Sequence, residues 1–258
     1  MKKITYLVMA VTVFLSRPLY ADHLQEPADK ADPDSPEILH FESDHSVEIG
    51  GRVINFQATA GTLEMKNEEG EAIAHFGYTA YTKKGGDKAR RPVLFAYNGG
   101  PGSASLWLHM GILGPQRTVV DDTAFVTTGP FERTNNEFSV LDKADLVMID
   151  PVGTGFSRPV GEAEGKDFWG VDNDIRSVSN FIALYITEYG RWASPKYLLG
   201  ESYGGIRSGG VAYKLLTSHN ITLNGVILVS PFMDYVAGAA GLKTTTPYYN
   251  YLCTFAAT

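Results

Sequence analysis

The residues best suited to chemistry surround Ser202, in the run Gly200–Gly204 with the sequence G-E-S-Y-G. A G-x-S-x-G run between a strand and a helix forms a sharp turn that exposes the serine hydroxyl, and the glycines let strand and helix approach each other. An apolar run at 197–199 precedes Ser202, and apolar residues at helical spacing follow it. This context predicts a nucleophilic serine; an ordinary glycine-rich turn is the alternative.

A second glycine-rich run, Asn98–Gly102, also follows an apolar stretch, at 93–97. When a serine attacks a carbonyl, the oxygen becomes an oxyanion, and backbone N–H groups stabilise it. One such donor comes from the residue after the nucleophile and the other from an earlier loop, where glycines leave the N–H groups accessible. Losing one donor costs roughly 2.7–4 kcal/mol of barrier. The run therefore predicts the earlier loop of an oxyanion hole.

The elements that must position these two runs alternate between strand and helix. Continuous apolar runs are typical of strands buried on both faces, and there are four of them, at 93–97, 146–149, 197–199 and 226–229. Apolar residues at helical spacing predict a helix over about 171–189, and Val211, Ala212, Leu215 and Leu216 predict another after Ser202. Strands that alternate with helices indicate a parallel sheet with right-handed crossovers.

The amino-terminal part of the chain has a different pattern. Residues 46–83 contain short β-like runs, with a turn at Asn67–Gly70, and predict an antiparallel meander. Residues 22–45 are rich in Asp, Glu, Pro and Ala and predict a flexible leader. The folded domain is therefore expected over 46–258. Its aromatic and apolar end, 247–252, suggests a domain that is interrupted at Thr258.

Four motifs in order resemble the signatures of the serine carboxypeptidases. They are N-G-G-P-G-S-A-S at 98–105, G-P at 114–115, D-P-V-G-T-G-F-S at 150–157 and G-E-S-Y-G at 200–204, within a resemblance that runs from about Arg91 to Asp234. The resemblance implies an α/β-hydrolase fold, with a mostly parallel central sheet, that stops as its cap begins.

The resemblance also implies a role for five residues. Ser202 would be the nucleophile, and the amides of Gly100 and Tyr203 would form the oxyanion hole. Asn98 and Glu201 would hydrogen bond the terminal carboxylate of a peptide substrate; a purely structural Glu201 is the alternative. The Glu201 carboxylate and the substrate's terminal carboxylate would then lie side by side and share a proton, so we expect peptide binding to favour acidic pH.

Two small departures from the family pattern leave this chemistry intact. Ser103 stands where the family often has Cys, and Gly204 stands where Ala is common.

A larger departure is the missing proton acceptor, since a serine needs a histidine base and a carboxylate that orients it. In α/β-hydrolases both follow the serine. His219 is the only later histidine, and it is expected on the surface at the far end of the helix that begins at the serine. His75 and His109 precede the serine and are kept as unusual alternatives, whereas Asp234 is expected to be a turn or capping residue. The resemblance places the acid and the histidine beyond Thr258, and we expect these 258 residues alone to be inactive.

The first 21 residues predict a signal peptide. Lys2 and Lys3 precede an apolar run from Ile4 to Leu15, and Ala21 suits the cleavage site. The run is too short to cross a bilayer comfortably, so a stable membrane anchor is the less favoured alternative. We expect export to the periplasm or secretion. The single cysteine, Cys253, excludes an internal disulfide and is expected to be a buried apolar side chain.

Composition excludes other classes of function. A net charge of −7, without a basic run, argues against nucleic-acid binding. The chain has no Cys/His cluster for zinc and no phosphate-binding loop motif, and serine hydrolysis requires neither metal nor cofactor. No residue pattern indicates an oligomeric state. The expected function is release of carboxyl-terminal residues from peptides through an acyl-enzyme; an esterase or lipase of the same fold and a non-catalytic truncated product are the alternatives.

Overall fold

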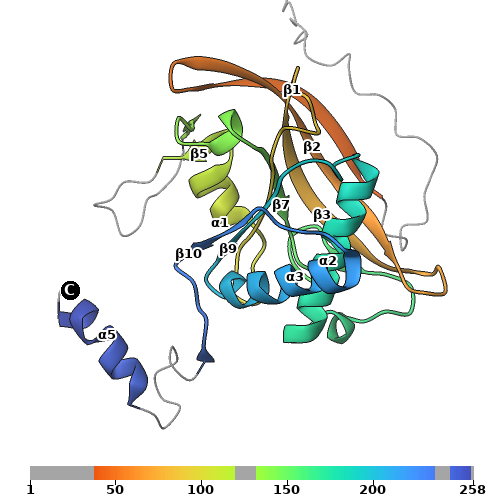
Figure 1. Ribbon diagram of the computed structural model, residues 1–258, viewed down its shortest axis with the longest axis vertical. Helices are drawn as coiled ribbons and strands as arrows, with labels where there is room; N and C mark the ends of the chain where they lie inside the picture. Colours follow the sequence, from red (N-terminus) through yellow and green to blue (C-terminus); the bar gives the residue numbers. More distant parts are fainter. Residues whose placement is uncertain (1–37, 120–131, 236–244, 257–258) are drawn as a thin grey trace, which may run out of the picture. The chain divides into compact units, whose positions relative to one another are not determined.

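The computed structural model describes residues 38–119, 132–235 and 245–256 (Figure 1). The predicted signal peptide, residues 22–37 of the predicted leader and the side chain of Cys253 lie outside the described residues.

One mixed sheet organises the described chain, with the strand order β1-β2-β3-β7-β4-β9-β10 and the short β8 (Arg158–Pro159) paired with β3. β4 (Val93–Tyr97), β7 (Asp145–Ile149), β9 (Lys196–Glu201) and β10 (Gly225–Val229) are parallel to one another. These are the four strands that the apolar runs predict. The predicted α/β class with a mostly parallel centre is confirmed.

The predicted antiparallel meander is also present. It consists of β1 (His40–Ile49), β2 (Arg52–Lys66) and β3 (Ala72–Lys83), and β3 joins the parallel strands through β7. The predicted turn at Asn67–Gly70 connects β2 to β3, with the Gly70 amide donating to the Asn67 carbonyl. The predicted leader is too long, because residues 40–45 belong to β1. Their side chains are exposed along the edge of the sheet, so they show no apolar period.

Two long helices cover one face of the sheet (Figure 1). They are α2 (Val171–Glu188) and α3 (Gly204–His219), at the positions predicted for helices. Val178, Phe181 and Ile182 of α2 and Val211 and Leu215 of α3 are buried in one apolar cluster with the sheet. This packing fixes the start of α3, and therefore the turn at Ser202, against the parallel strands.

A second apolar cluster occupies the opposite face of the sheet. Leu108, Leu113 and Leu141 cover it from short elements that the sequence does not predict. These elements are α1 (Leu106–Leu108), the π-helical turn η1 (His109–Leu113), the hairpin of β5 (Gln116–Thr118) and β6 (Arg133–Asn135), and η2 (Val140–Asp142). Two further elements are η3 (Gly165–Asp167) before α2 and α5 (Thr246–Ala256) near the end of the chain.

A buried ionic network lies at the amino ends of the parallel strands. Asp145 Oδ1 accepts from Arg91 Nε at 2.6 Å and from the Lys83 amide at 2.9 Å, while Asp145 Oδ2 accepts from Arg191 Nη1 at 2.7 Å. Arg191 Nε donates to Ser194 Oγ at 2.7 Å. Asp145 and Arg191 are each only 2% exposed, so every charge here has a partner within the protein.

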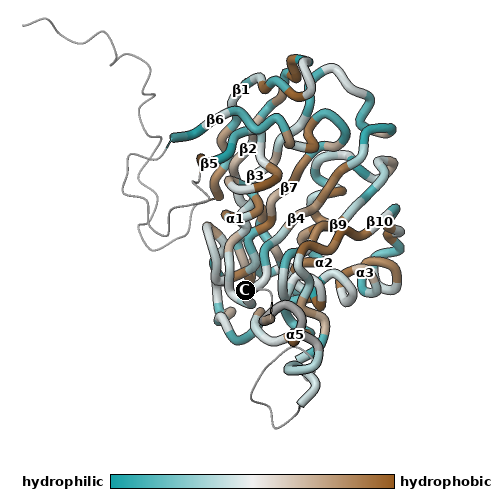
Figure 2. Tube along the Cα trace, turned by 90° about the vertical axis from the view of Figure 1, so that its left-hand side faces the viewer, coloured by the Kyte–Doolittle hydropathy of each residue, from teal (hydrophilic) through white to brown (hydrophobic). Residues whose placement is uncertain are grey.

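β10 forms one edge of the sheet and is apolar along its length (Figure 2). Val226, Ile227 and Leu228 are 42%, 45% and 41% exposed, although their sequence is typical of a strand covered on both faces. Within the described ranges, none of the helices combines the length and apolarity that a bilayer crossing requires.

Candidate active site

Ser202 lies at the sharp turn between β9 and α3, with a φ of 57°. This left-handed backbone is uncommon for a residue with a side chain and costs about 1–2 kcal/mol. Hydrogen bonds hold the turn: the Ser202 amide donates to the Val229 carbonyl at 3.0 Å, and the Ser202 carbonyl accepts from the amides of Gly205 and Phe232. Gly200 is required here, because a Cβ at this position would lie 2.2 Å from the Gly204 carbonyl oxygen. The predicted nucleophile therefore has the strained, glycine-flanked turn that its motif suggests.

The glycine-rich run that follows β4 packs directly on this turn. A Cβ added to Gly99 would lie 2.5 Å from the Tyr203 backbone nitrogen and 2.6 Å from the Glu201 carbonyl oxygen. Gly100 follows in the same loop with a φ of 103°. The structure thus brings the loop that carries Gly100 against the backbone of Tyr203, as two donors to one oxyanion require.

Asn98 and Glu201 meet beside Ser202. Asn98 Nδ2 donates to Glu201 Oε2 at 3.0 Å, and the Gly99 amide donates to the same oxygen at 3.3 Å. Asn98 Oδ1 in turn accepts from the Leu108 amide at 3.0 Å, which orients its NH2 group toward Glu201. Asn98 is buried and Glu201 is half-buried. The pair is therefore built into the turn, and one Glu201 oxygen already has two donors.

The third motif, at 150–157, is hydrogen bonded to the end of the first motif at Ser105. Asp150 Oδ1 accepts from the Ser105 amide at 2.8 Å, and the Ser105 hydroxyl donates to the Ile149 carbonyl. Ser157 Oγ links the Asp150 carbonyl to the Gly77 amide. Burial raises the pKa of the Asp150 carboxyl. This motif holds loops together, and its residues Pro151–Thr154 line a cavity beside Tyr203.

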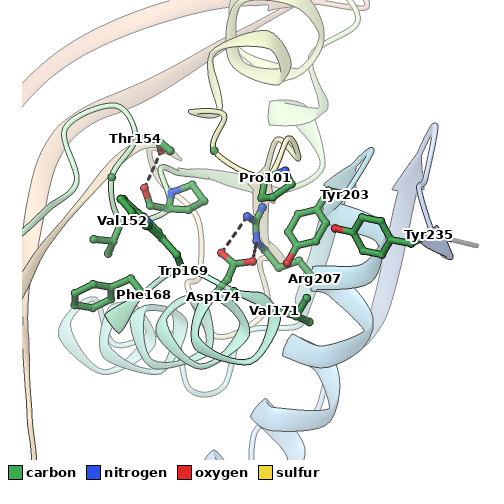
Figure 3. Close-up of a pocket in the computed structure, with 14 residues that line it drawn as sticks. Pro101, Val152, Thr154, Phe168, Trp169, Val171, Asp174, Tyr203, Arg207 and Tyr235 are labelled. Carbon is green, nitrogen blue, oxygen red and sulfur yellow. Dashed lines mark hydrogen bonds and ion pairs between the residues drawn. The ribbon is translucent and has the colours of Figure 1, made fainter. Parts of the chain in front are cut away.

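A cavity of about 380 Å³ adjoins Tyr203 at the carboxyl ends of the strands. Figure 3 shows Trp169 and Phe168 on one side and Tyr203 and Tyr235 on the other, with the Asp174–Arg207 ion pair between them. Burial raises the pKa of Tyr203 to about 12, so its phenol is neutral. Part of this lining, including Tyr203, belongs to the four motifs, whereas Trp169, Asp174, Arg207 and Tyr235 lie outside them. The sequence feature that could have indicated this second part is Arg207, a charged residue in the first turn of the helix after Ser202, on the face that the helix buries.

The histidines that the sequence leaves as alternatives are engaged elsewhere. His219 ends α3, is half-buried and hydrogen bonds Asn180 Oδ1 at 3.1 Å. His75 is buried in β3 with Nε2 3.8 Å from Glu64 Oε2, and His109 Nε2 hydrogen bonds the Tyr81 hydroxyl. Burial lowers the pKa of His109. Asp234 is exposed in the segment after β10. The described residues also contain no cluster of side chains suited to a metal ion.

Comparison with known proteins identifies the family. A sequence profile of the serine carboxypeptidases matches residues 49–252. The chain belongs to the serine carboxypeptidase family. The chain is 29% identical over 167 residues to the pheromone-processing carboxypeptidase KEX1 of Saccharomyces cerevisiae, covering 58% of this chain and 21% of the relative. It is 26% identical over 190 residues to carboxypeptidase Y of the same yeast, covering 70% of this chain and 32% of the relative.

The fold comparison agrees with this membership. The crystal structure of the yeast KEX1 carboxypeptidase superimposes with a TM-score of 0.55 at 21% identity, over 78% of this chain and 43% of that chain. The predicted α/β-hydrolase architecture is thereby confirmed. The chain spans about a fifth to a third of the length of these two curated relatives.

Proposed function

We propose that Ser202 is the nucleophile of a serine carboxypeptidase that releases carboxyl-terminal residues from peptides. The observation that carries this proposal is the Asn98–Glu201 pair beside a serine with a φ of 57°. An amide and a carboxyl group next to the nucleophile suit a terminal carboxylate. A peptide bound there would present its last peptide bond to Ser202.

In the proposed reaction, Ser202 Oγ attacks the carbonyl carbon of the last peptide bond. The amides of Gly100 and Tyr203 stabilise the oxyanion, and the terminal amino acid leaves as the acyl-enzyme forms. The base gives the proton taken from Ser202 to the departing amino group, and water then attacks the ester, which releases the shortened peptide and regenerates the serine. The base that accepts the Ser202 proton and the acid that orients it are proposed to lie in sequence beyond residue 258, since the matching relatives are several times longer than the matched region.

A fluorophosphonate probe tests the nucleophile in the native protein as its own gene produces it. We expect a labelled band above the 28.1 kDa of this chain on a denaturing gel and none after Ser202→Ala. No label, or label only at or below 28.1 kDa, would favour a non-catalytic product instead.

Asn98 and Glu201 separate a carboxypeptidase from an esterase of the same fold. Asn98→Ala or Glu201→Gln should reduce peptide cleavage far more than cleavage of a simple ester, because only the peptide presents a terminal carboxylate. Equal losses on both substrates would favour the esterase.

Export is the second part of the proposal, supported by the basic start and apolar run of residues 1–21. The mature protein should then be found in the periplasm or the medium, with an amino terminus near Asp22. Recovery in the cytoplasm with residues 1–21 retained would contradict export.

A further inference from the structure

Arg207 is a buried cation beside the proposed carboxylate site, yet none of the four motifs includes it. It lies in the first turn of α3 and is 1% exposed. Its guanidinium forms a two-pronged pair with Asp174 of α2: Nε donates to Oδ2 at 2.8 Å and Nη2 to Oδ1 at 3.0 Å. The pair fixes the plane of the guanidinium, because a carboxylate and a guanidinium match at two points.

The third edge of this guanidinium reaches the glycine-rich loop. Arg207 Nη1 donates to the main-chain carbonyl of Asn98 at 2.7 Å. The C=O and N–H of a trans peptide point in opposite directions. When Arg207 holds the Asn98 carbonyl, the Gly99 amide is therefore turned the other way, where it donates to Glu201 Oε2.

Two aromatic rings enclose the same guanidinium. Its Cζ lies 5.2 Å from the ring centre of Tyr97, which precedes Asn98, and 5.2 Å from that of Tyr203, which follows Ser202. Cations are attracted to aromatic faces at such distances. Arg207 thus touches both loops of the site from below, and Figure 3 shows it paired with Asp174 beside Tyr203.

We propose that Arg207, held by Asp174, is a positioning residue that aims the Asn98–Gly99 peptide at Glu201 and thereby sets the preference for a free terminal carboxylate. This inference rests on the proposed carboxypeptidase function. Lysine cannot take over the role, since one ammonium cannot supply a planar fork and a third, fixed donor.

The test compares two peptides that differ only at the end: one has a terminal carboxylate and the other a terminal carboxamide. The measured quantity is the ratio of their kcat/KM values in the native protein. This ratio does not depend on the fraction of enzyme that is folded, because both rates come from one preparation. Arg207→Lys should lower the ratio about tenfold, as for one misdirected hydrogen bond to a charged group. Asp174→Asn should lower it in the same direction by less.

Arg191→Lys is the matched control. Arg191 is an equally buried arginine paired with Asp145 at the other end of the strands, so the change disturbs stability without touching the site. Its ratio should equal that of the wild type. A ratio that is unchanged in Arg207→Lys, or lowered equally in both variants, would overturn the inference. A wild-type protein that does not distinguish the two peptides would instead contradict the proposed function.

Discussion

At the amino ends of β4, β7 and β9, Arg91 and Arg191 share the single carboxylate of Asp145 in a buried network. At the carboxyl ends of the same strands, Arg207 also has an aspartate partner, but its remaining donor is directed at the main chain of the site. At the amino ends, each charged group is paired with a charged group of the same network. The other end combines satisfied charges with a strained serine and a half-buried carboxyl group. The contrast indicates that the amino ends serve stability, and it is consistent with the proposed active site at the carboxyl ends.

The largest expected effect is on stability and tests the ionic network around Asp145. Asp145→Ala leaves two buried arginines without their carboxylate and should lower the free energy of unfolding by about 3–5 kcal/mol. Urea denaturation of the variant and the wild type measures it. Asp44→Ala, which removes only the exposed pair with Lys84, should cost about 1 kcal/mol or less. Similar losses in both variants would contradict the role assigned to the amino ends.

The next effect concerns activity at the carboxyl ends. Gly99→Ala places a Cβ 2.5 Å from the Tyr203 nitrogen, so the loop must move away from the turn at Ser202. We expect kcat/KM of the native protein for a peptide to fall roughly 10²–10³-fold, the effect of one lost oxyanion donor. Gly111→Ala, where the added Cβ meets nothing within 4 Å, is the control and should retain activity. Full activity in Gly99→Ala would show that the close approach is unimportant.

A smaller effect has the opposite sign from that of Asp145→Ala. Ser202→Gly removes the penalty of a left-handed backbone, whereas Ser202→Ala retains it. The free energy of unfolding of the glycine variant should therefore be about 1 kcal/mol higher than that of the alanine variant. Thermal unfolding of the two variants, neither of which has the serine hydroxyl, measures the difference. An alanine variant that is equally stable would mean that the turn stores no strain.

The smallest effect depends on pH. Burial lowers the pKa of His109 in the folded protein, so the unfolded chain binds more protons as the pH falls below about 6.5. Stability is thus lost on acidification, and His109→Gln should flatten the dependence of the unfolding free energy between pH 7 and 5. A wild-type slope in His109→Gln would show that this histidine does not contribute.

The sequence predicts most of the elements that carry the site, for a physical reason. Strands buried on both faces must be continuously apolar, so β4, β7, β9 and β10 stand out, and the glycine runs at their ends mark the turns. The sequence does not predict the start of β1, because its first side chains, including His40, Glu42 and Asp44, are all exposed. They therefore show no alternation of apolar and polar residues that would mark a strand.

The ionic partners of the site could not be predicted in this way. Arg207 pairs with Asp174 across 33 residues and bonds Asn98 across 109, and only the packing of α2 and α3 on the sheet brings them together. A charged residue inside a buried helix turn shows that a partner must exist, but it does not name the partner. The roles of Gly100, Tyr203, Asn98 and Glu201 remain predictions, although the structure places all four around Ser202.

The exposed apolar edge at β10 has a consequence for handling the protein. Among the described strands β10 pairs with β9 alone, so its outer row of backbone groups can template another strand. Pairing between two separate copies is second order in protein concentration. Dilution therefore slows association between separate copies at this edge. The protein concentration therefore sets how fast the exposed edge of β10 pairs with a strand of another copy.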